Sequence, residues 1–434
     1  MSDNYEITEK YSPDIDEKYY YTKHKSGLDI YFIPKKLTTS YALITTKYGA
    51  VDNRFRLRGE RDWTEVPDGI AHFLEHKMFE NEDGEDTFEK YSRYGGNANA
   101  FTASRSTSYL VSCTDNFDEN LGILLDLVSS PYFTPENVQK EQGIIGQEIQ
   151  MGLDNPGRAL YYNLLEAMYA KSQIKINVAG SIESISKITA DLLYSCYYTF
   201  YNLSNMVLVV SGDVSMERIL KAADAILPNL EPNDIIRDYN DEEPEVAKSR
   251  ITDERDVSKP LFRIGIKDVD IPKDGDDRMR KSIAVSLLYQ VMFGPTSDFA
   301  VNLFESGLVN GFGAGYGLSN MNAYGSLGGE SDDPEKVFSL FLERVDDALK
   351  NGISEEEFNI VKRAAYASYV RSFDSTNEIA DSFTFTYLDG GDYFDYGKLL
   401  SDVDFEEVSS YIEKIFKPEY YAMSVINPKN GDKK

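Results

Sequence analysis

Short runs of alternating or continuous apolar residues predict strands in the first half of the chain. Residues 28–34 alternate apolar and polar positions, as a half-buried strand does, and residues 41–47 form a second such segment. Residues 206–210 are entirely apolar, and residues 97–113 indicate two strands that turn back at Ser104-Arg105-Ser106. These segments predict a sheet that contains at least one hairpin.

A strong helix-start signal follows at residues 134–136. Thr134 is a good N-cap, and Pro135 suits the first helical position because its missing N–H would be unpaired there. We expect this helix to run to about residue 153, where Asn155-Pro156 stops it.

The two halves of the chain resemble each other weakly. Phe200-Tyr201 before the strand at 206–210 matches Phe416-Lys417 before a mostly apolar segment at 422–426, an offset of 416 − 200 = 216. The helix start at 134 matches one at 354, an offset of 354 − 134 = 220. Two similar offsets in the same order predict a duplicated domain. Chance similarity between amphipathic helices is the alternative.

An acidic, proline-bearing stretch separates these halves. Residues 229–257 have neither helical nor strand periodicity and are predicted to be a linker. The expected organisation is an N-terminal domain at 1–228 and a homologous C-terminal domain at 258–434. The expected fold class is α+β, with two tandem duplicated α/β domains, each a mixed, mostly antiparallel sheet packed with helices.

Composition narrows the class of protein. With 434 residues, 41% of them hydrophobic, the chain can build two or three cores. A formal charge of −28 argues against nucleic acid and anionic membranes as partners. The two cysteines, without a CxxC motif, exclude a disulfide scaffold. Neither a signal peptide nor a membrane-spanning run is evident, so a cytoplasmic location is expected.

Two of the three histidines form the motif His72-Phe73-Leu74-Glu75-His76. On a helix, residues four apart share a face, so both imidazoles can meet one metal ion. Glu75 lies on the same side, where it can hold a water molecule against that metal. The order of residues mirrors the H-E-x-x-H zinc helix. The sequence therefore predicts a zinc site.

The alternative is an amphipathic helix in which the histidines coincide by chance. It accounts for the apolar positions Ile70, Phe73, Leu74 and Phe79. It does not account for two imidazoles and a carboxylate among them, because buried polar groups need partners.

A hydrolytic zinc site usually takes three protein ligands, so a third is needed. His24 lies between Lys23 and Lys25, whose charges repel a cation. Glu141 and Glu148 are better candidates, because they are two helical turns apart and share a face near apolar residues. An ordinary solvated glutamate face is the alternative.

The residues around these positions resemble the pitrilysin/insulinase/mitochondrial-processing-peptidase metallopeptidases, the inverzincins. In that family an H-x-x-E-H motif precedes a ligand glutamate by some seventy residues, near the end of an E-x6-E helix. Here the spacings are 148 − 76 = 72 and 148 − 141 = 7. Residues 69–71, 95–102 and 180–182 also fit the family pattern. The second half fits more loosely.

This resemblance implies a role for each site residue. Zinc would be held by His72, His76 and Glu148, with Glu75 as the base and Glu141 orienting a ligand. A substrate would add as a strand to an exposed sheet edge, whose matching residues here are Asn99, Ala100, Phe101 and Thr102. The short bacterial members of the family likewise carry two duplicated domains per chain.

The second half departs from the catalytic pattern. Offset 220 places Val361 and Ser368 where the first half has Glu141 and Glu148, and no histidine follows position 76. Active members bring an arginine and a tyrosine from a segment that matches residues 303–312, but no arginine occurs between Arg280 and Arg344. Tyr316 is the candidate for the tyrosine.

Two classes of function follow. The favoured one is a zinc endopeptidase that cuts peptides or small unfolded proteins, and a non-catalytic or partner-dependent peptide-binding subunit is the rival. Since two domains are half of the family's four-domain chamber, we expect a dimer. The expected partner is a related companion that supplies the Arg-Tyr pair, and a homodimer is the second choice.

Overall fold

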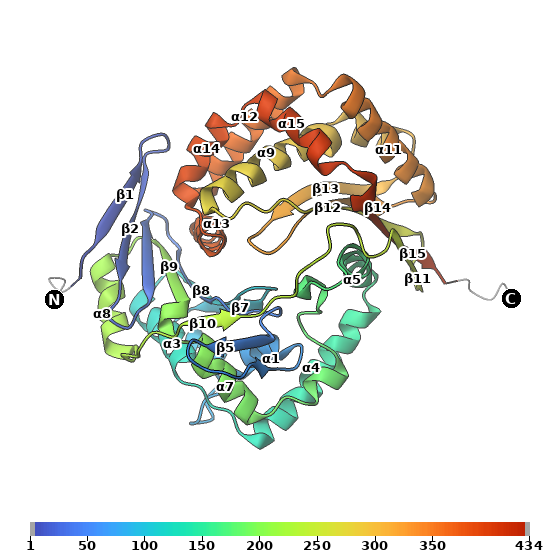
Figure 1. Cartoon of the computed structure of the whole chain (residues 1–434). Helices are drawn as coiled ribbons and strands as arrows, with labels where there is room; N and C mark the ends of the chain where they lie inside the picture. Colours follow the sequence, from blue (N-terminus) through green and yellow to red (C-terminus); the bar gives the residue numbers. More distant parts are fainter. Residues whose placement is uncertain (1–4, 430–434) are drawn as a thin grey trace. The chain divides into compact units, whose positions relative to one another are not determined.

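The structure is a computed structural model that describes residues 5–429, and these divide into two compact units (Figure 1). Unit 1 holds the chain up to residue 150 together with 176–239 and 371–388. Unit 2 holds 151–175, 240–370 and the chain from 389 onward. Each unit has its own hydrophobic core around one main sheet.

Unit 1 is built on a seven-stranded sheet in the order β1-β2-β3-β9-β4-β8-β7. Its strands are β1 (Thr8–Ser12), β2 (Glu17–Lys23), β3 (Asp29–Pro34), β4 (Ser40–Thr46), β7 (Asn97–Thr102), β8 (Thr107–Cys113) and β9 (Met206–Gly212). A smaller sheet joins β10 (Ile235–Arg237), β5 (Arg54–Leu57) and β6 (Thr64–Glu65). The four predicted strand segments of the first half are confirmed.

Unit 2 is built on a five-stranded sheet in the order β11-β15-β12-β14-β13. Its strands are β11 (Arg250–Arg255), β12 (Leu261–Asp268), β13 (Asn310–Leu318), β14 (Ala323–Glu330) and β15 (Tyr421–Pro428). The order β3-β9-β4-β8-β7 of unit 1 is repeated strand for strand. In both units the first pair is parallel and the other three pairs are antiparallel. The predicted duplicated α+β fold is therefore confirmed.

Helices pack on these sheets. In unit 1 they are α1 (Ile70–Lys77), α2 (Thr87–Arg93), α3 (Phe117–Ser129), α4 (Pro135–Asp154, whose last residues are assigned to unit 2), α6 (Ile182–Ile185), α7 (Ala190–Phe200), α8 (Met216–Ile226) and α13 (Thr376–Leu388). In unit 2 they are α5 (Pro156–Met168), α9 (Gly275–Phe293), α10 (Asp298–Glu305), α11 (Pro334–Asn351), α12 (Glu355–Ser372), α14 (Tyr396–Asp402) and α15 (Phe405–Ile415).

Each unit takes one helix from the other half of the sequence. Helix α13 belongs to unit 1, where Phe383 packs on Tyr19 and Tyr31 with ring centroids 5.2 and 4.7 Å apart. Helix α5 belongs to unit 2, where a side chain on Gly265 of β12 would collide with Met168. The compact units are therefore not contiguous in sequence.

The segment 229–257, predicted to be a linker without periodic structure, contains two short strands. Strand β10 pairs with β5 in unit 1, and β11 pairs with β15 in unit 2. Both add to the edge of an existing sheet, so pairing with a partner strand forms them rather than a pattern of their own. The domain limits 1–228 and 258–434 stay a prediction.

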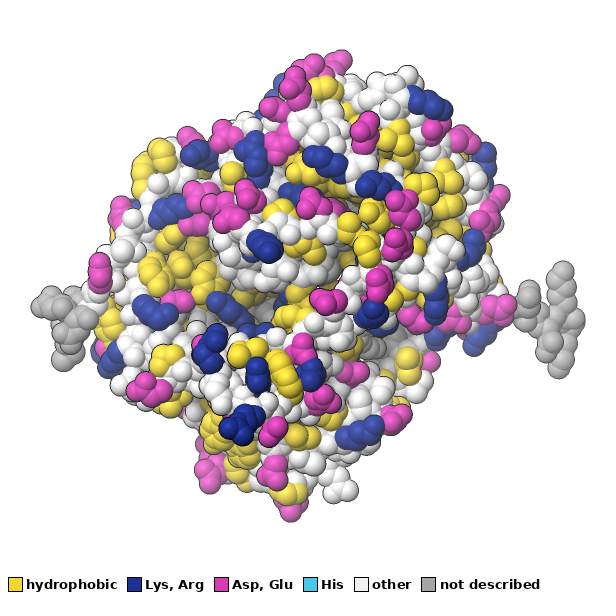
Figure 2. Space-filling model, viewed as in Figure 1, with side chains coloured by type: hydrophobic (Ala, Val, Ile, Leu, Met, Phe, Trp, Pro, Cys, Tyr) yellow, Lys and Arg dark blue, Asp and Glu magenta, His cyan; other side chains and the backbone are white. Residues whose placement is uncertain are grey.

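The surface carries the acidic charge without gathering it in one place. Figure 2 shows Asp and Glu side chains spread over the viewed face and mixed with Lys and Arg. Within residues 5–429, no helix has the length and apolar character needed to cross a membrane.

Candidate metal centre

Helix α1 begins at a tight crossing of two backbone segments. Its N-cap, Gly69, has φ 90°, and a Cβ there would lie 2.6 Å from the carbonyl oxygen of Ala179. Gly180, with φ 72°, faces the same crossing, and its Cβ would lie 2.4 Å from the carbonyl oxygen of Asp68. Glycine is needed at both positions because a side chain would meet backbone atoms. This crossing fixes where α1 enters the core.

Helix α1 buries its apolar side chains and turns its motif residues to one side. Ile70, Phe73 and Leu74 lie in the core of unit 1. His72 and His76 are partly buried, with side-chain exposures of 12% and 29%, and their ring centroids are 4.6 Å apart. The two imidazoles therefore lie on one helix face, as their four-residue spacing predicts.

Helix α4 brings the two predicted carboxylates to the same place. It starts as the sequence indicates, with the hydroxyl of Thr134 accepting a hydrogen bond from the backbone N–H of Asn137 at 3.2 Å. Val138, Ile145 and Ile149 are buried, so the helix is held on the core by one apolar face. Glu141 and Glu148 lie along the margin of that face, because seven residues make two turns.

The three predicted ligands converge. One Glu148 oxygen lies 3.6 Å from Nε2 of His72, and the other lies 3.6 Å from Nε2 of His76. One ligand atom from each residue can be chosen so that all three lie within 4.8 Å of one another. Two ligands about 2.1 Å from a tetrahedral zinc ion are about 3.4 Å apart. The donor set therefore fits zinc in spacing and in chemical type.

Glu141 does not point at this cluster but supports it. Its Oε1 lies 3.0 Å from Nδ1 of His76, the ring nitrogen that does not face Glu148. A carboxylate in this position makes Nδ1 the protonated nitrogen and leaves Nε2 free to bind a metal. Burial alone would lower the pKa of His76, but the hydrogen bond to Glu141 and the nearby carboxylates outweigh it and raise that pKa.

Glu75 is separate from the ligands and buried. Its Oε2 accepts a hydrogen bond from the hydroxyl of Thr102 on β7 at 2.7 Å. Burial raises the pKa of Glu75, against the lowering effects of Thr102 and His76. A carboxyl group with a raised pKa beside a metal site is suited to taking up and returning a proton.

Strand β7 is one of the two edge strands of the main sheet in unit 1, and within residues 5–429 it pairs with β8 alone. The backbone N–H of Ala100 donates to the side chain of Asn99 at 2.9 Å. Thr102 joins this strand to the base, because its hydroxyl contacts Glu75. Substrate binding by residues 99–102 stays a prediction, but the strand they form is an open edge beside the metal centre.

The remaining histidine lies elsewhere, as expected. His24 is 2% exposed, with Nδ1 2.8 Å from the hydroxyl of Ser26 and Nε2 3.3 Å from Asp224. Burial lowers the pKa of this imidazole. His24 is therefore a buried, hydrogen-bonded histidine and not a ligand of this cluster.

The second unit does not repeat the centre. Among the described residues, the metal-compatible cluster is confined to His72, His76 and Glu148. On α12, Ser368 is exposed and Val361 packs against the core of unit 2. The hydroxyl of Tyr316 donates to Asp268 at 2.7 Å, so this tyrosine is held inside unit 2.

One buried charge near the centre was not singled out from the sequence. The Lys77 side chain, directly after His76, is 0% exposed and lies 2.6 Å from a Glu80 oxygen. The signal that could have found it is its helical spacing, since Lys77 lies three residues after Leu74 and four after Phe73, on the apolar face where an ammonium group must have partners.

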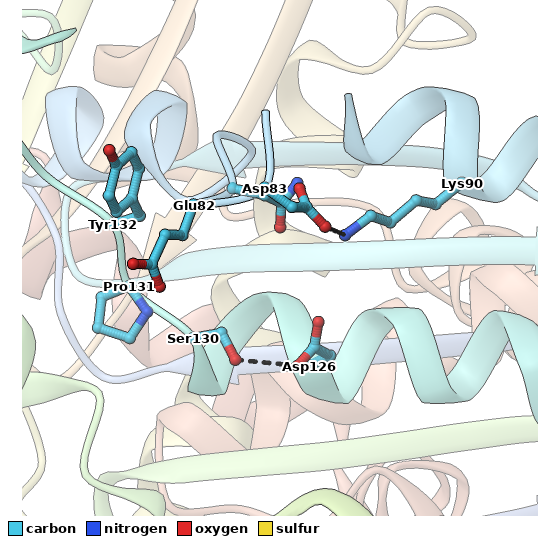
Figure 3. A pocket seen from close by; sticks show the side chains of 8 residues that line it. Glu82, Asp83, Lys90, Asp126, Ser130, Pro131 and Tyr132 are labelled. Atoms are coloured by element: carbon cyan, nitrogen blue, oxygen red, sulfur yellow. Dashed lines mark hydrogen bonds and ion pairs between the residues drawn. The ribbon is translucent and has the colours of Figure 1, made fainter. Parts of the chain in front are cut away.

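A cleft of about 560 Å³ lies beyond the C-terminal end of helix α1, and Figure 3 shows its lining. Asp83 pairs with Lys90 at 3.5 Å, and Asp126 accepts a hydrogen bond from Ser130 at 2.9 Å. Glu82 lies beside Pro131 and Tyr132 (Figure 3). The cleft shares no lining residue with the metal cluster, so it is not the centre described above.

Two family descriptions match successive parts of the chain. "Insulinase (Peptidase family M16)" matches residues 59–181, which contain the whole metal cluster. "Peptidase M16 inactive domain" matches residues 187–365, which include most of unit 2.

Similar proteins cover nearly the full length. The "Uncharacterized zinc protease YmfH" of Bacillus subtilis is 35% identical over 437 residues, covering 96% of this chain and 98% of that protein. A putative M16-like peptidase from Alicyclobacillus acidocaldarius has a TM-score of 0.90 at 32% identity, covering 98% of this chain and 99% of that one. Pitrilysin, with a TM-score of 0.75 and 14% identity, shares the fold, and this chain covers 47% of its length.

Proposed function

Because this chain belongs to peptidase family M16, we propose that it is a zinc-dependent endopeptidase that cuts extended peptides or small unfolded proteins. The observation that carries the proposal is the convergence of His72, His76 and Glu148, with a buried glutamate beside them. Relatives named zinc proteases support the choice of metal.

Zinc would be held by these three side chains, and when bound it supplies Lewis acidity to the scissile carbonyl and to a water molecule. Glu75 takes a proton from the attacking water and returns it to the nitrogen of the leaving amine. Thr102 orients Glu75 through its 2.7 Å hydrogen bond. Glu141 keeps the proton of His76 on Nδ1 through the 3.0 Å contact.

The open edge of β7 supports a preference for extended substrates. A peptide that pairs with this edge is held by its backbone, so many sequences are accepted, while a folded protein offers no free strand. Residues 99–102 would form the receiving strand, and Thr102 at its end places that strand beside Glu75. Maturation of a peptide precursor would fit the same site.

A second function, a non-catalytic or partner-dependent peptide-binding subunit, is favoured by two observations. Residues 187–365 match a domain described as inactive, and no arginine occurs between Arg280 and Arg344. We propose that a related companion chain supplies the missing Arg-Tyr pair in a dimer, with a homodimer as the second choice.

Three variants test the proposed enzyme. Glu75→Gln should keep one zinc per chain and lose turnover by at least about 100-fold, because proton transfer contributes about 10²–10⁴. His72→Ala combined with His76→Ala should lose the zinc. His24→Gln, the matched control at the histidine outside the cluster, should keep it. Full zinc content in the double histidine variant would refute the assignment.

A further inference from the structure

We propose that Lys77 is a positioning residue whose buried ammonium docks helix α4 against helix α1 and so sets the place of Glu148 beside the two histidines. The inference rests on the proposed zinc site and adds a residue that touches neither the metal nor the substrate. Lys77 acts on how helices α1 and α4 bring their ligands together.

The Lys77 ammonium has partners on both sides of the helix junction. It lies 2.6 Å from Glu80, just beyond the end of its own helix, and 3.4 Å from the carbonyl oxygen of Asn137 on α4. Its side chain is 0% exposed, whereas that of Glu80 is 33% exposed. A lysine buried this deeply is costly unless its charge is met, so the contacts constrain where both partners lie.

The contact on α4 falls at the residue that organises the start of that helix. The side chain of Asn137 accepts from the backbone N–H of Thr134 at 2.9 Å and donates to the carbonyl of Tyr132 at 3.2 Å. In an α-helix the carbonyl of Asn137 is also the acceptor for the backbone N–H of Glu141, four residues on. Lys77 therefore holds α4 at the turn that leads directly to Glu141.

The apolar contacts that hold α4 to the core constrain its position along its own axis less strongly. Val138, Ile145 and Ile149 are buried, but apolar burial is non-directional and tolerates small sliding along the helix axis. Gln142 donates to the carbonyls of Ile185 and Ile188 at 3.3 and 3.1 Å, which ties α4 to a different segment. Lys77 is a directional link from the helix that carries the histidines, and it acts one turn before the 3.0 Å contact of His76 with Glu141, the other such link.

The position of Glu148 depends on this link because both its oxygens must reach the histidines of α1. A helix rises about 1.5 Å per residue, so Glu148 lies about 16 Å along α4 from Asn137 and moves with it as a rigid rod. A shift of about 1 Å would spoil the two 3.6 Å separations that suit zinc.

The test measures zinc affinity by competition with a chelator of known affinity, using the full chain. Lys77→Met keeps the length and apolar stem but removes the ammonium. It should weaken zinc binding about tenfold, the lower end of what supporting groups around a metal site contribute. A second variant, Lys77→Met with Glu80→Met, removes both charges. Replacing a buried charge together with its ion-pair partner by apolar residues is often neutral for stability, so this variant decides the question if the first does not fold.

Two controls separate positioning from general stability. Glu80→Gln keeps an oxygen for the ammonium and the contact with Asn137, so zinc affinity should stay within about twofold. Lys267→Met removes another buried lysine, 3% exposed and paired with Glu242 in unit 2, and should lower the unfolding temperature without changing zinc affinity.

The outcomes are distinct. Zinc affinity within about twofold of wild type in the Lys77 variants would overturn the positioning role while leaving the zinc site intact. A loss of affinity in Lys267→Met equal to that in Lys77→Met would also overturn it, because the effect would then be global. If the wild-type chain binds no zinc, or the double histidine variant still binds it, the proposed function fails instead.

Discussion

Three glutamates at the centre differ in role because their surroundings differ. The two side-chain oxygens of Glu148 face the Nε2 atoms of the two histidines. Glu141 instead meets Nδ1 of His76, and Glu75 is turned toward Thr102. Burial raises the pKa of Glu75, whereas the contact with His76 outweighs burial and lowers the pKa of Glu141. In the proposed site, one residue type would thus serve as ligand, orienting group and proton carrier.

The raised pKa of His76 gives the metal-free centre a pH dependence whose sign can be worked out. Zinc binds the neutral imidazole, so protons compete with zinc for His76. Because the pKa of His76 is raised, this competition should begin at a pH above the ordinary histidine pKa of about 6.5. Glu141→Gln removes the carboxylate whose hydrogen bond contributes most to raising the pKa of His76, so zinc loss on acidification should begin at a lower pH. Zinc affinity at pH 7.5 should also fall about 10–100-fold. Zinc release followed against pH checks both.

The same pKa shift predicts the stability of the metal-free chain. A histidine whose folded pKa is raised stabilises the fold below its unfolded pKa, and this stability is lost as pH rises through the folded value. The unfolding temperature of wild type should therefore exceed that of Glu141→Gln by more at pH 5.5 than at pH 8. An equal difference at both pH values would contradict the role of His76.

At the scale of elements, a helix pair and a strand edge make the site. In the proposed site, helix α1 would supply two ligands and the base, helix α4 the third ligand, and β7 the open edge beside them. The helices are joined by side-chain contacts, while the edge is joined to α1 by the Thr102–Glu75 hydrogen bond. Metal binding and substrate binding can therefore be changed separately.

A proline in β7 tests the strand-addition hypothesis. The N–H of Ala100 is used by the side chain of Asn99, which indicates that it points to the free edge rather than to β8. Ala100→Pro should lower kcat/KM for peptides at least about tenfold with little loss of stability, because an edge N–H can be removed without breaking the ladder. Peptide hydrolysis and thermal unfolding are the measurements.

The contrasting variant is Asn99→Pro. Backbone groups alternate between the two sides of a strand, so the N–H of Asn99 faces β8 and its loss should reduce stability. Unchanged peptide cleavage in Ala100→Pro would exclude pairing at this edge.

At the scale of the whole molecule, the exchange of helices ties each unit to the other half of the sequence. Phe383→Ala should destabilise unit 1 by about 3–5 kcal/mol, although it lies in the second half, because its ring is buried on Tyr19 and Tyr31. Trp63, the single tryptophan, lies in unit 1 and reports its unfolding in urea by fluorescence. The matched control is Phe385→Ala on the same helix, 41% exposed, which should cost less than about 1 kcal/mol.

The proposed companion chain also belongs to the scale of the whole molecule. Loss of one charge-stabilising donor typically costs about 10²–10³ in rate, so the purified chain alone should be nearly silent on a peptide that it cuts when a companion with the Arg-Tyr pair is added. Activity assays with and without candidate companions, alongside the molecular mass in solution, test this. Full activity of the chain by itself would remove the need for a heterologous partner.

The sequence by itself determined whatever depends on neighbours a few residues apart. The four-residue spacing of His72 and His76 forces both rings onto one helix face, and Thr134-Pro135 sets the start of α4 within one residue. Two similar offsets between matching segments of the two halves likewise predicted a duplicated domain, which the repeated order of strands shows. Such features are local, or repeat local patterns, and need no knowledge of packing.

Only the tertiary structure decided which distant groups meet. The sequence left Glu141 and Glu148 as equal candidates until a resemblance separated them, whereas the packing of α4 on α1 places one at Nδ1 and the other at Nε2. The contact of Lys77 with Asn137 and the passage of α13 into unit 1 have no local pattern. They arise from apolar burial and pairing between segments tens to hundreds of residues apart, and periodicity within a segment does not encode these contacts.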